Sequence, residues 1–232
     1  MSARTAVVTG ANRGIGLEVA RQLAARGGTV VLGARDRAKG EAAARAVDPG
    51  GTRVLARQLD VADPASVAAF AAWAGDELER VDVLVNNAAI SYDTWQRGVD
   101  ADLDAVHEAF ETNLFGAWRV TQALLPLLRA SGHARVVMVS SEGGSLTSMG
   151  GGTPAYSTSK AALNALTRVL AAELRGDGVL VNAVCPGWTA TDMGGGGGRP
   201  VADGAASVMW AVDLPDGGPT GGFTRDGRPL PW

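Results

Sequence analysis

The stretch "TGANRGIG", Thr9 to Gly16, decides the fold of this chain. It follows an apolar run that is typical of a strand and opens a stretch that is typical of a helix ending at Gly27. Glycine lets a backbone turn tightly and approach a phosphate, and a helix N-terminus offers free N–H groups and partial positive charge to that phosphate. Gly10, Gly14 and Gly16 are spaced as T-G-x-x-x-G-x-G, not as G-x-G-x-x-G. The stretch predicts a dinucleotide-binding loop, and a glycine-rich turn without a ligand is the alternative.

Apolar runs alternate with helix-like stretches along the rest of the chain. The runs are continuously apolar, which is typical of strands that are buried on both faces of a parallel sheet. We expect residues 1–232 to form a single α/β domain of the Rossmann type, a doubly wound parallel sheet of about seven strands with helices on both faces. The expected strands cover residues 5–10, 29–35, 52–61, 81–88, 134–141, 179–187 and 221–227.

Two of the expected helices carry clear start signals. Asp63 can cap a helix whose first turn contains Pro64, and Thr153 with Pro154 marks the start of another. The main helical stretches after residue 60 are 63–79, one long region over about 103–130, 153–176 and 201–211.

The composition excludes several classes of protein. Hydrophobic residues make up 46% of the 232 residues, which is too many for a disordered chain. A net charge of −3 provides no basic field, so we expect no nucleic acid as a partner. No apolar run approaches ~18 residues, so we expect no membrane span. The N-terminus also lacks the charged-then-apolar pattern of a signal peptide.

The cysteine and histidine content bears on redox compartment and metals. Cys185 is the one cysteine, which excludes an internal disulfide and suits a reducing cytosol. His107 and His133 lie far apart with no cysteine cluster nearby. We therefore expect a cytoplasmic protein without a metal site.

The end of the second expected strand bears on the choice of dinucleotide. An NAD-selective site places an acidic residue there to bind the ribose 2′-hydroxyl, whereas this chain has Ala34 followed by Arg35. Arg13 and Arg35 together offer two guanidinium groups, which suit a 2′-phosphate. The pair predicts NADP(H) in preference to NAD(H), although Asp36 favours the opposite choice. The alternative is two solvated surface arginines.

The stretch "YSTSK", Tyr156 to Lys160, is a second candidate site. Residues four apart share a helical face, so Tyr156 and Lys160 should point the same way. A free tyrosine has a pKa of about 10 and is a poor acid or base at neutral pH. A nearby ammonium favours the phenolate and lowers that pKa. The same spacing also arises by chance in many helices, so by itself it is a weak signal.

Taken with "TGANRGIG", this pair makes the chain resemble the short-chain dehydrogenase/reductase family over nearly its whole length. Seven motifs occur in the order of that family. They are "TGANRGIG", "LDV" (59–61), "NNAA" (86–89), "TNLFG" (112–116), "VSS" (139–141), "YSTSK" and "PGWTATDM" (186–193). The segments "LGARD" and "CPGWTATDM" look most like the NADPH-dependent carbonyl reductase branch, and the tail "DLPDGGPTGGF" does so more loosely.

The resemblance implies roles for four catalytic residues. Tyr156 would be the general acid/base, and Lys160 would lower its pKa and hydrogen-bond the nicotinamide ribose. Ser141 would position the substrate oxygen, and Asn113 would hold a water in the proton relay to the lysine. Hydride would pass from nicotinamide C4 to the carbonyl carbon while Tyr156 protonates the oxygen, the protein supplying orientation and the proton.

The resemblance also implies a set of cofactor contacts. Asp60 and Val61 would contact adenine, while Asn87 and Ala88 would line the adenine-ribose side and brace the sheet. A loop beginning at Pro186 would hold the nicotinamide amide and the pyrophosphate. The whole expected set is Gly10, Asn12, Arg13, Gly14, Ile15, Gly16, Arg35, Asp60, Val61, Asn87, Ala88, Tyr156, Lys160, Pro186, Gly187, Thr189 and Thr191.

The chain departs from the family pattern in three places. Fourteen residues separate Ser141 from Tyr156, two more than is usual, which leaves Ser140 and Ser145 as weaker substitutes for Ser141. Five glycines follow Met193 where relatives usually carry a helix or bulky side chains, so we expect a mobile substrate loop over residues 192–200. The long insertion that monomeric carbonyl reductases carry before the catalytic tyrosine is missing. The helix faces around 103–130 and 155–175 are then free to pair, which predicts a homodimer or homotetramer.

The function that these features predict is reduction of a small-molecule ketone or aldehyde to an alcohol with NADPH, in a reversible reaction. An NADP-dependent alcohol or sugar dehydrogenase working mainly as an oxidant is one alternative. A non-catalytic NADP(H)-binding sensor or scaffold is another, but a sensor has no need of Tyr156. The substrate itself depends on loops whose shape the sequence does not give.

Overall fold

A computed structural model describes residues 4–90 and 93–232, and within these ranges the chain builds one sheet of eight strands. The strand order is β3-β2-β1-β4-β5-β6-β7-β8; neighbours from β3 to β7 are parallel, and β8 pairs antiparallel with β7. The strands are β1 (Thr5–Thr9), β2 (Thr29–Ala34), β3 (Val54–Gln58), β4 (Val83–Asn86), β5 (Arg135–Val139), β6 (Leu180–Val184), β7 (Phe223–Arg225) and β8 (Arg228–Pro229).

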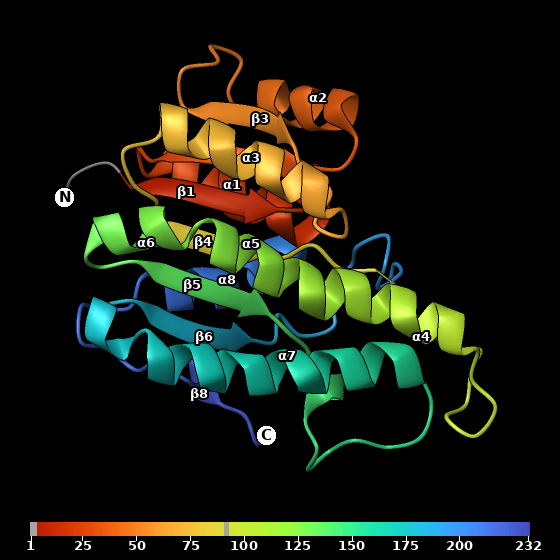
Figure 1. Ribbon diagram of the computed structural model, residues 1–232. Coiled ribbons are helices and arrows are strands. Elements are labelled where there is room, and N and C mark those ends of the chain that lie inside the picture. Colours follow the sequence, from red (N-terminus) through yellow and green to blue (C-terminus); the bar gives the residue numbers. More distant parts are fainter. Residues whose placement is uncertain (1–3, 91–92) are drawn as a thin grey trace.

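Helices cover both faces of this sheet (Figure 1). One face is covered by α1 (Gly14–Ala25), α2 (Arg37–Val47) and α8 (Val201–Val212). The other face carries α3 (Pro64–Glu77), α5 (Ala117–Ala123), α6 (Leu125–Ser131) and α7 (Pro154–Glu173), with α4 (Leu103–Phe110) packed against α7. Valines and leucines of the central strands fill both cores, which explains why these strands are continuously apolar.

The order in which strands are added to the sheet reverses at β1, because β2 and β3 lie on one side of it and β4 to β8 lie on the other. In open parallel sheets, ligands bind at such a reversal, outside the carboxyl ends of the strands. The glycine-rich loop after β1 and the residues after β4 meet there. The expected doubly wound α/β fold is confirmed, and the predicted strand end at Ala34 and the Asp63 cap on α3 are confirmed as well.

Two details add to the predicted element pattern. The expected long helical region over 103–130 is helical, but it contains a π-helical turn, η1 (Glu111–Gly116), and it is interrupted at Leu124, because Pro126 has no N–H to continue the earlier helix. The expected last strand is a hairpin, β7 with β8, which raises the strand number from seven to eight. Asp226 and Gly227 have φ of 52° and 74° and form its tight turn.

No helix in residues 4–90 and 93–232 is long and apolar enough to cross a bilayer.

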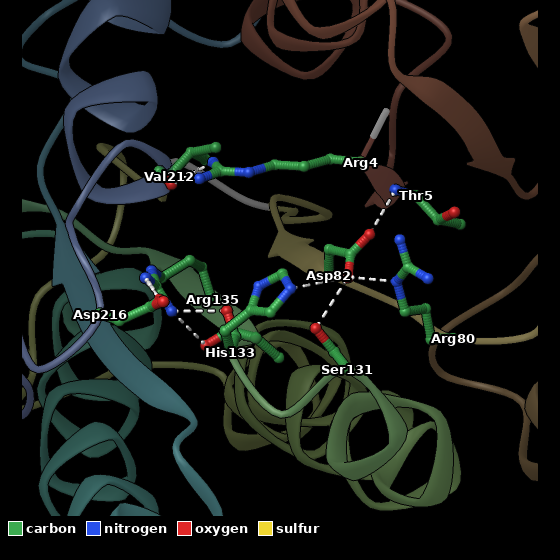
Figure 2. A network of polar contacts seen from close by, with 10 residues as sticks. Arg4, Thr5, Arg80, Asp82, Ser131, His133, Arg135, Val212 and Asp216 are labelled. Atoms are coloured by element: carbon green, nitrogen blue, oxygen red, sulfur yellow. Dashed lines mark hydrogen bonds and ion pairs between the residues drawn. The ribbon is translucent and has the colours of Figure 1, made fainter. Parts of the chain in front are cut away.

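A buried polar network around Asp82 connects residues at the amino-terminal ends of the strands, opposite the carboxyl ends where ligands bind (Figure 2). Asp82 is 1% exposed and accepts hydrogen bonds from the Thr5 main chain at 2.8 Å, from Ser131 at 2.8 Å and from Arg80 at 2.9 Å. Burial alone would raise the pKa of Asp82, but these hydrogen bonds and the Arg80 charge outweigh it and hold the pKa below its ordinary value.

We expect Asp82→Asn to lower the free energy of unfolding by about 3 kcal/mol at pH 7, because it removes one partner of a buried charged network. A carboxylate with a depressed pKa stabilises the fold above its ordinary pKa and loses that contribution as the pH falls through the folded-state value. Urea unfolding of wild type and variant should therefore converge between pH 7 and pH ~3. A pH-independent difference would contradict this account, and Asp100→Asn, in an exposed ion pair with Arg97, is the control.

Candidate functional site

The glycine-rich loop between β1 and α1 is packed directly against the residues that follow β4. Gly10 has a φ of 63°, and a Cβ on it would lie 2.8 Å from the Cα of Ala88. A Cβ on Gly16 would lie 2.5 Å from Nδ2 of Asn87. Asn87 in turn donates to the carbonyls of Thr9 and Gly10, at 2.9 and 3.2 Å. Asn87 and Ala88 thus brace the loop, and only glycine leaves the backbone room for this approach.

A cleft of about 620 Å³ opens at this reversal of the sheet. It runs from the loop after β2 at one end to α7 and the loop after β6 at the other. Fourteen of the predicted site residues line it: Gly10, Asn12, Arg13, Gly14, Ile15, Arg35, Asp60, Val61, Asn87, Ala88, Tyr156, Lys160, Pro186 and Thr191. Five predicted residues do not line it: Gly16, Asn113, Ser141, Gly187 and Thr189.

Cations gather at the β2 end of the cleft. Arg35 is exposed and makes no ion pair within the described ranges, and Lys39 lines the same wall one helical turn later. Asp36 is occupied differently: its Oδ1 accepts the Lys39 main-chain N–H at 3.0 Å and so caps α2. That hydrogen bond, with the Lys39 charge, holds the pKa of Asp36 below its ordinary value.

Arg13 reaches across the mouth of the cleft. Its guanidinium lies 2.6 Å from Oδ2 of Asp192, which belongs to the loop after β6, and both side chains are exposed. On the same side, a methyl of Thr191 would be 3.4 Å from a Cβ on Gly14. The glycine-rich loop and residues 191–192 therefore form opposite lips of the cleft.

Tyr156 and Lys160 line the cleft from the first turns of α7, as their spacing predicts. The Lys160 ammonium lies 5.7 Å from the centroid of the Tyr156 ring and donates to the carbonyl of Val139 at 2.8 Å. Lys160 is 2% exposed. This burial lowers the pKa of Lys160 to about 8, against a smaller opposing effect of Cys185.

A buried ammonium with a depressed pKa is a cost to the fold. We expect Lys160→Met to raise the free energy of unfolding by about 1–3 kcal/mol at pH 7, measured by urea titration without added cofactor. The unfolded lysine keeps its ordinary pKa of 10.5, so the cost is complete below about pH 8 and declines as the pH rises toward 10.5. The gain in the variant should shrink over the same range. A variant that is less stable than wild type at pH 7, or a gain in the free energy of unfolding that does not change with pH, would contradict the burial argument.

Asn113 lies in the π-helical turn and is buried, with all of its amide engaged by protein groups. Its Oδ1 accepts the Ile90 N–H at 2.9 Å, and its Nδ2 donates to the Ile90 carbonyl at 3.2 Å and to Ser159 at 3.0 Å. The side chain thus clamps η1 to the end of β4 and to α7. A water held by this residue would have to donate to one of its oxygens, because both amide protons are already used.

The two serines at the end of β5 have different surroundings. Ser140 lines the cleft, but its hydroxyl is 2.6 Å from Oδ1 of the buried Asn164, to which it donates. Ser141 is partly exposed, and its Oγ accepts the Gly143 N–H at 3.1 Å, which leaves its own hydroxyl proton available. The assignment of the substrate-positioning serine to Ser141 stays a prediction.

The glycine run after Met193 forms a turn that is anchored at both ends. A Cβ on Gly194 would collide with the Thr189 carbonyl, and one on Gly198 would lie 2.5 Å from the Thr189 carbon, while Gly196 and Gly197 face open space. The indole N–H of Trp188 donates to the Gly194 carbonyl at 2.8 Å. Arg199 closes the turn through two hydrogen bonds of 3.0 Å to Asp226. The expected mobility of residues 192–200 stays a prediction that concerns the middle of this turn.

Several residues of the cleft were missing from the predicted set. Asp36, Lys39 and Asp192 are the charged ones, and Lys39 and Asp192 do not stand out in sequence from ordinary solvated residues. The others are Leu59, Ala89, Ile90, Thr112, Val139, Ser140, Ala190, Met193 and Val201. No group of three or more His, Cys, Asp or Glu side chains within the described ranges could hold a metal ion.

Comparison with known proteins assigns the chain to a family. Residues 4–198 match the short chain dehydrogenase family. Carbonyl reductase [NADPH] 1 of Bos taurus is 34% identical over 98% of this chain and 98% of its own length, and (+)-neomenthol dehydrogenase of Capsicum annuum is 32% identical over 96% and 95%. The NADPH-bound carbonyl reductase from chicken fatty liver is 29% identical and superposes with a TM-score of 0.91 over 100% of both chains.

The family match and the relatives agree on the class of chemistry. The Bos taurus alignment spans 278 positions, more than the 232 residues of this chain, because the relative carries segments that this chain lacks. The match to the family covers the glycine-rich loop, α7 and every cleft residue except Val201. The chain therefore belongs to the short chain dehydrogenase family and is an oxidoreductase that acts on C=O or CH–OH groups.

Proposed function

We propose that this protein reduces a ketone or aldehyde to the alcohol with NADPH, reversibly, using Tyr156, Lys160, Ser141 and Asn113. The observation that carries the proposal is the single cleft that joins the glycine-rich loop to the Tyr156–Lys160 pair. Relatives whose names state NADPH-dependent carbonyl reduction support it.

The residues at the β2 end of the cleft fit a 2′-phosphate. Arg13, Arg35 and Lys39 would supply three cations, and Asp36 is occupied as the cap of α2 instead of facing a ribose hydroxyl. Guanidinium and ammonium groups both pair well with phosphate. Arg13 would exchange its exposed partner Asp192 for the phosphate. The pyrophosphate would lie on the glycine-rich loop at the N-terminus of α1.

The chemistry at the other end divides between cofactor and protein. A bound NADPH would supply the hydride. Tyr156 would hold the proton that passes to the carbonyl oxygen, and the Lys160 ammonium would stabilise the phenolate that remains. Ser141 would donate a hydrogen bond to the same oxygen, and an oxygen of Asn113 would lead a water toward Lys160.

The alternatives make different predictions for the same assay. An alcohol or sugar dehydrogenase would turn over NADP⁺ with alcohols faster than NADPH with carbonyls. A sensor would bind NADPH and turn over nothing. The experiment is therefore consumption of NADPH and of NADH across a panel of ketones, aldehydes and quinones, followed by NADP⁺ with the matching alcohols. Activity with NADPH on a carbonyl supports the proposal, and binding of NADPH without turnover of any panel member contradicts it.

We also propose a cytoplasmic homodimer or homotetramer that pairs through the helix faces around 103–130 and 155–175. Exposed apolar side chains on these faces support it, namely Leu103, Phe115, Trp118 and Val169. Sedimentation of the purified protein tests it, with a monomer at micromolar concentration as the contradicting result.

A further inference from the structure

Asp93 is a buried carboxylate at the start of α7 that none of the roles above uses. It lies on the segment after β4, and its side chain is 1% exposed. Its Oδ2 accepts the main-chain N–H of Ala155 at 2.8 Å, and its Oδ1 accepts the main-chain N–H of Tyr156 at 3.1 Å. The residue that is the proposed acid is thus held, through its own main chain, by a residue 63 positions earlier.

Asp93 is the partner of every first-turn N–H donor of α7 that has none within the helix. The first N–H groups of a helix have no partner within it and need one when they are buried. Pro154 has no N–H, and the N–H of Ser157 reaches the Thr153 carbonyl at 2.9 Å. The donors that remain are those of Ala155 and Tyr156, and both end on Asp93.

Thr153 is the N-cap that the sequence predicts for α7, but its side chain does not cap the helix. Its φ is 46°, its side chain makes no capping hydrogen bond, and its hydroxyl pairs with Ser157 at 2.9 Å instead. The predicted start of the helix is right, but the capping group comes from a distant segment.

The Asp93 segment also connects α7 to the neighbouring helix. The Asp93 carbonyl accepts the N–H of Gln96 at 3.1 Å, and Oε1 of Gln96 accepts the N–H of Asp102 at 2.7 Å. Asp102 is itself the cap of α4. On its other side, Asp93 lies close in sequence to Ala89 and Ile90, which line the cleft. Asp93 therefore links the first turn of α7 to the segment that leads into α4.

We propose that Asp93 is a positioning residue for the reaction, which sets the location of Tyr156 by capping the first turn of α7. This inference rests on the proposed function for its rate measurement, because it takes Tyr156 as the group that transfers the proton. A displacement of about 1 Å at a reacting group can cost about 10²-fold in rate, so even a small shift of this turn should be visible in kcat.

The test is a graded series, Asp93→Asn, Asp93→Ser and Asp93→Ala, with kcat, KM and the Kd for NADPH measured for each. Asparagine keeps one acceptor oxygen but turns its NH2 group toward the second main-chain N–H, so it should lower kcat by a smaller factor than alanine does, about 3–10-fold. Alanine leaves both N–H groups without a partner and should lower kcat by about 10–100-fold. The Kd for NADPH should stay within about threefold, since its phosphates are held by other elements. The kcat of Asp93→Ser should fall between those of Asp93→Asn and Asp93→Ala, and the serine variant replaces the alanine variant in the test if the latter does not fold.

Asp63→Ala is the matched control. Asp63 caps α3 through the Ala65 N–H at 2.9 Å but is exposed. Its loss should lower the free energy of unfolding by about 1 kcal/mol and leave kcat within about twofold.

A second measurement is independent of turnover. The amide hydrogens of Ala155 and Tyr156 should exchange with solvent at least about tenfold faster in Asp93→Ala than in wild type, while those of mid-helix Leu166 and Leu170 do not change. If wild type turns over no carbonyl, the proposed function fails and amide exchange alone decides the capping role. Asp93 loses its role if wild type is active and Asp93→Ala keeps kcat within twofold, if Asp63→Ala loses as much, or if amide exchange is unaltered.

Discussion

Tyr156→Phe should lower kcat for carbonyl reduction by about 10²–10⁴-fold, the usual contribution of a positioned acid. The substitution removes one oxygen and keeps the ring that packs beside the Lys160 ammonium, 5.7 Å from the ring centroid. Neither NADPH, which would supply only the hydride, nor Ser141 would supply the proton that Tyr156 would transfer. Since the cleft walls are otherwise preserved, the Kd for NADPH should stay within about twofold. Steady-state kinetics and fluorescence titration of NADPH measure the two quantities.

Thr158→Val is the control for this experiment, because it removes an exposed hydroxyl from the same helical turn. It should keep kcat within about twofold. Retention of more than about a tenth of the wild-type kcat by Tyr156→Phe would show that another group supplies the proton.

The double substitution Arg13→Ala and Arg35→Ala should raise the Kd for NADPH by about 10²-fold or more at low salt and leave the Kd for NADH within about threefold. Each guanidinium would contribute a charge-assisted hydrogen bond to the 2′-phosphate, which NADH lacks. Loss of the Arg13 contact to Asp192 weakens nothing else of consequence, because both side chains are exposed and such pairs contribute little to stability.

Arg37→Ala is the matched control for this pair. Arg37 carries the same charge close by in α2, but it pairs with Glu41 at 2.8 Å and does not line the cleft. It should change neither Kd by more than about twofold. Equal weakening of NADPH and NADH in the double variant, or a wild-type preference for NADH, would remove the argument from the arginines.

The fold was predictable because it depends on local features of the sequence. Continuous apolar runs such as Val30, Val31 and Leu32 are buried on both sides of the sheet, and the crossover between two parallel strands is almost always right-handed. The glycine-rich loop was predictable for the same reason, since its spacing is fixed by the close approach of Gly10 to Ala88. The closing hairpin also had a signal, the Asp226–Gly227 pair, which is typical of a tight turn between strands.

The parts of the site that could not be predicted depend on contacts between distant residues. Asp93 reaches the N-terminus of α7 across 63 positions, and Arg13 meets Asp192 across 179. No local pattern distinguishes these acids from solvated ones. The π-helical turn at Asn113 changes the hydrogen-bond register of an ordinary amphipathic stretch, and no residue type marks it. In the sequence, Lys39 likewise resembles an ordinary surface lysine, and only the fold shows that it lines the cleft with Arg35.

The central claim is transfer of hydride from NADPH to a carbonyl carbon in this cleft. The most direct test is a reaction with NADPH that carries deuterium at both hydrogen positions of nicotinamide C4, using a carbonyl on which wild type is active, followed by mass analysis of the product. The account predicts deuterium on the carbinol carbon of the alcohol with wild-type protein and almost none with Tyr156→Phe. Consumption of NADPH without labelled alcohol, or binding of NADPH with no carbonyl of the panel reduced, would contradict it.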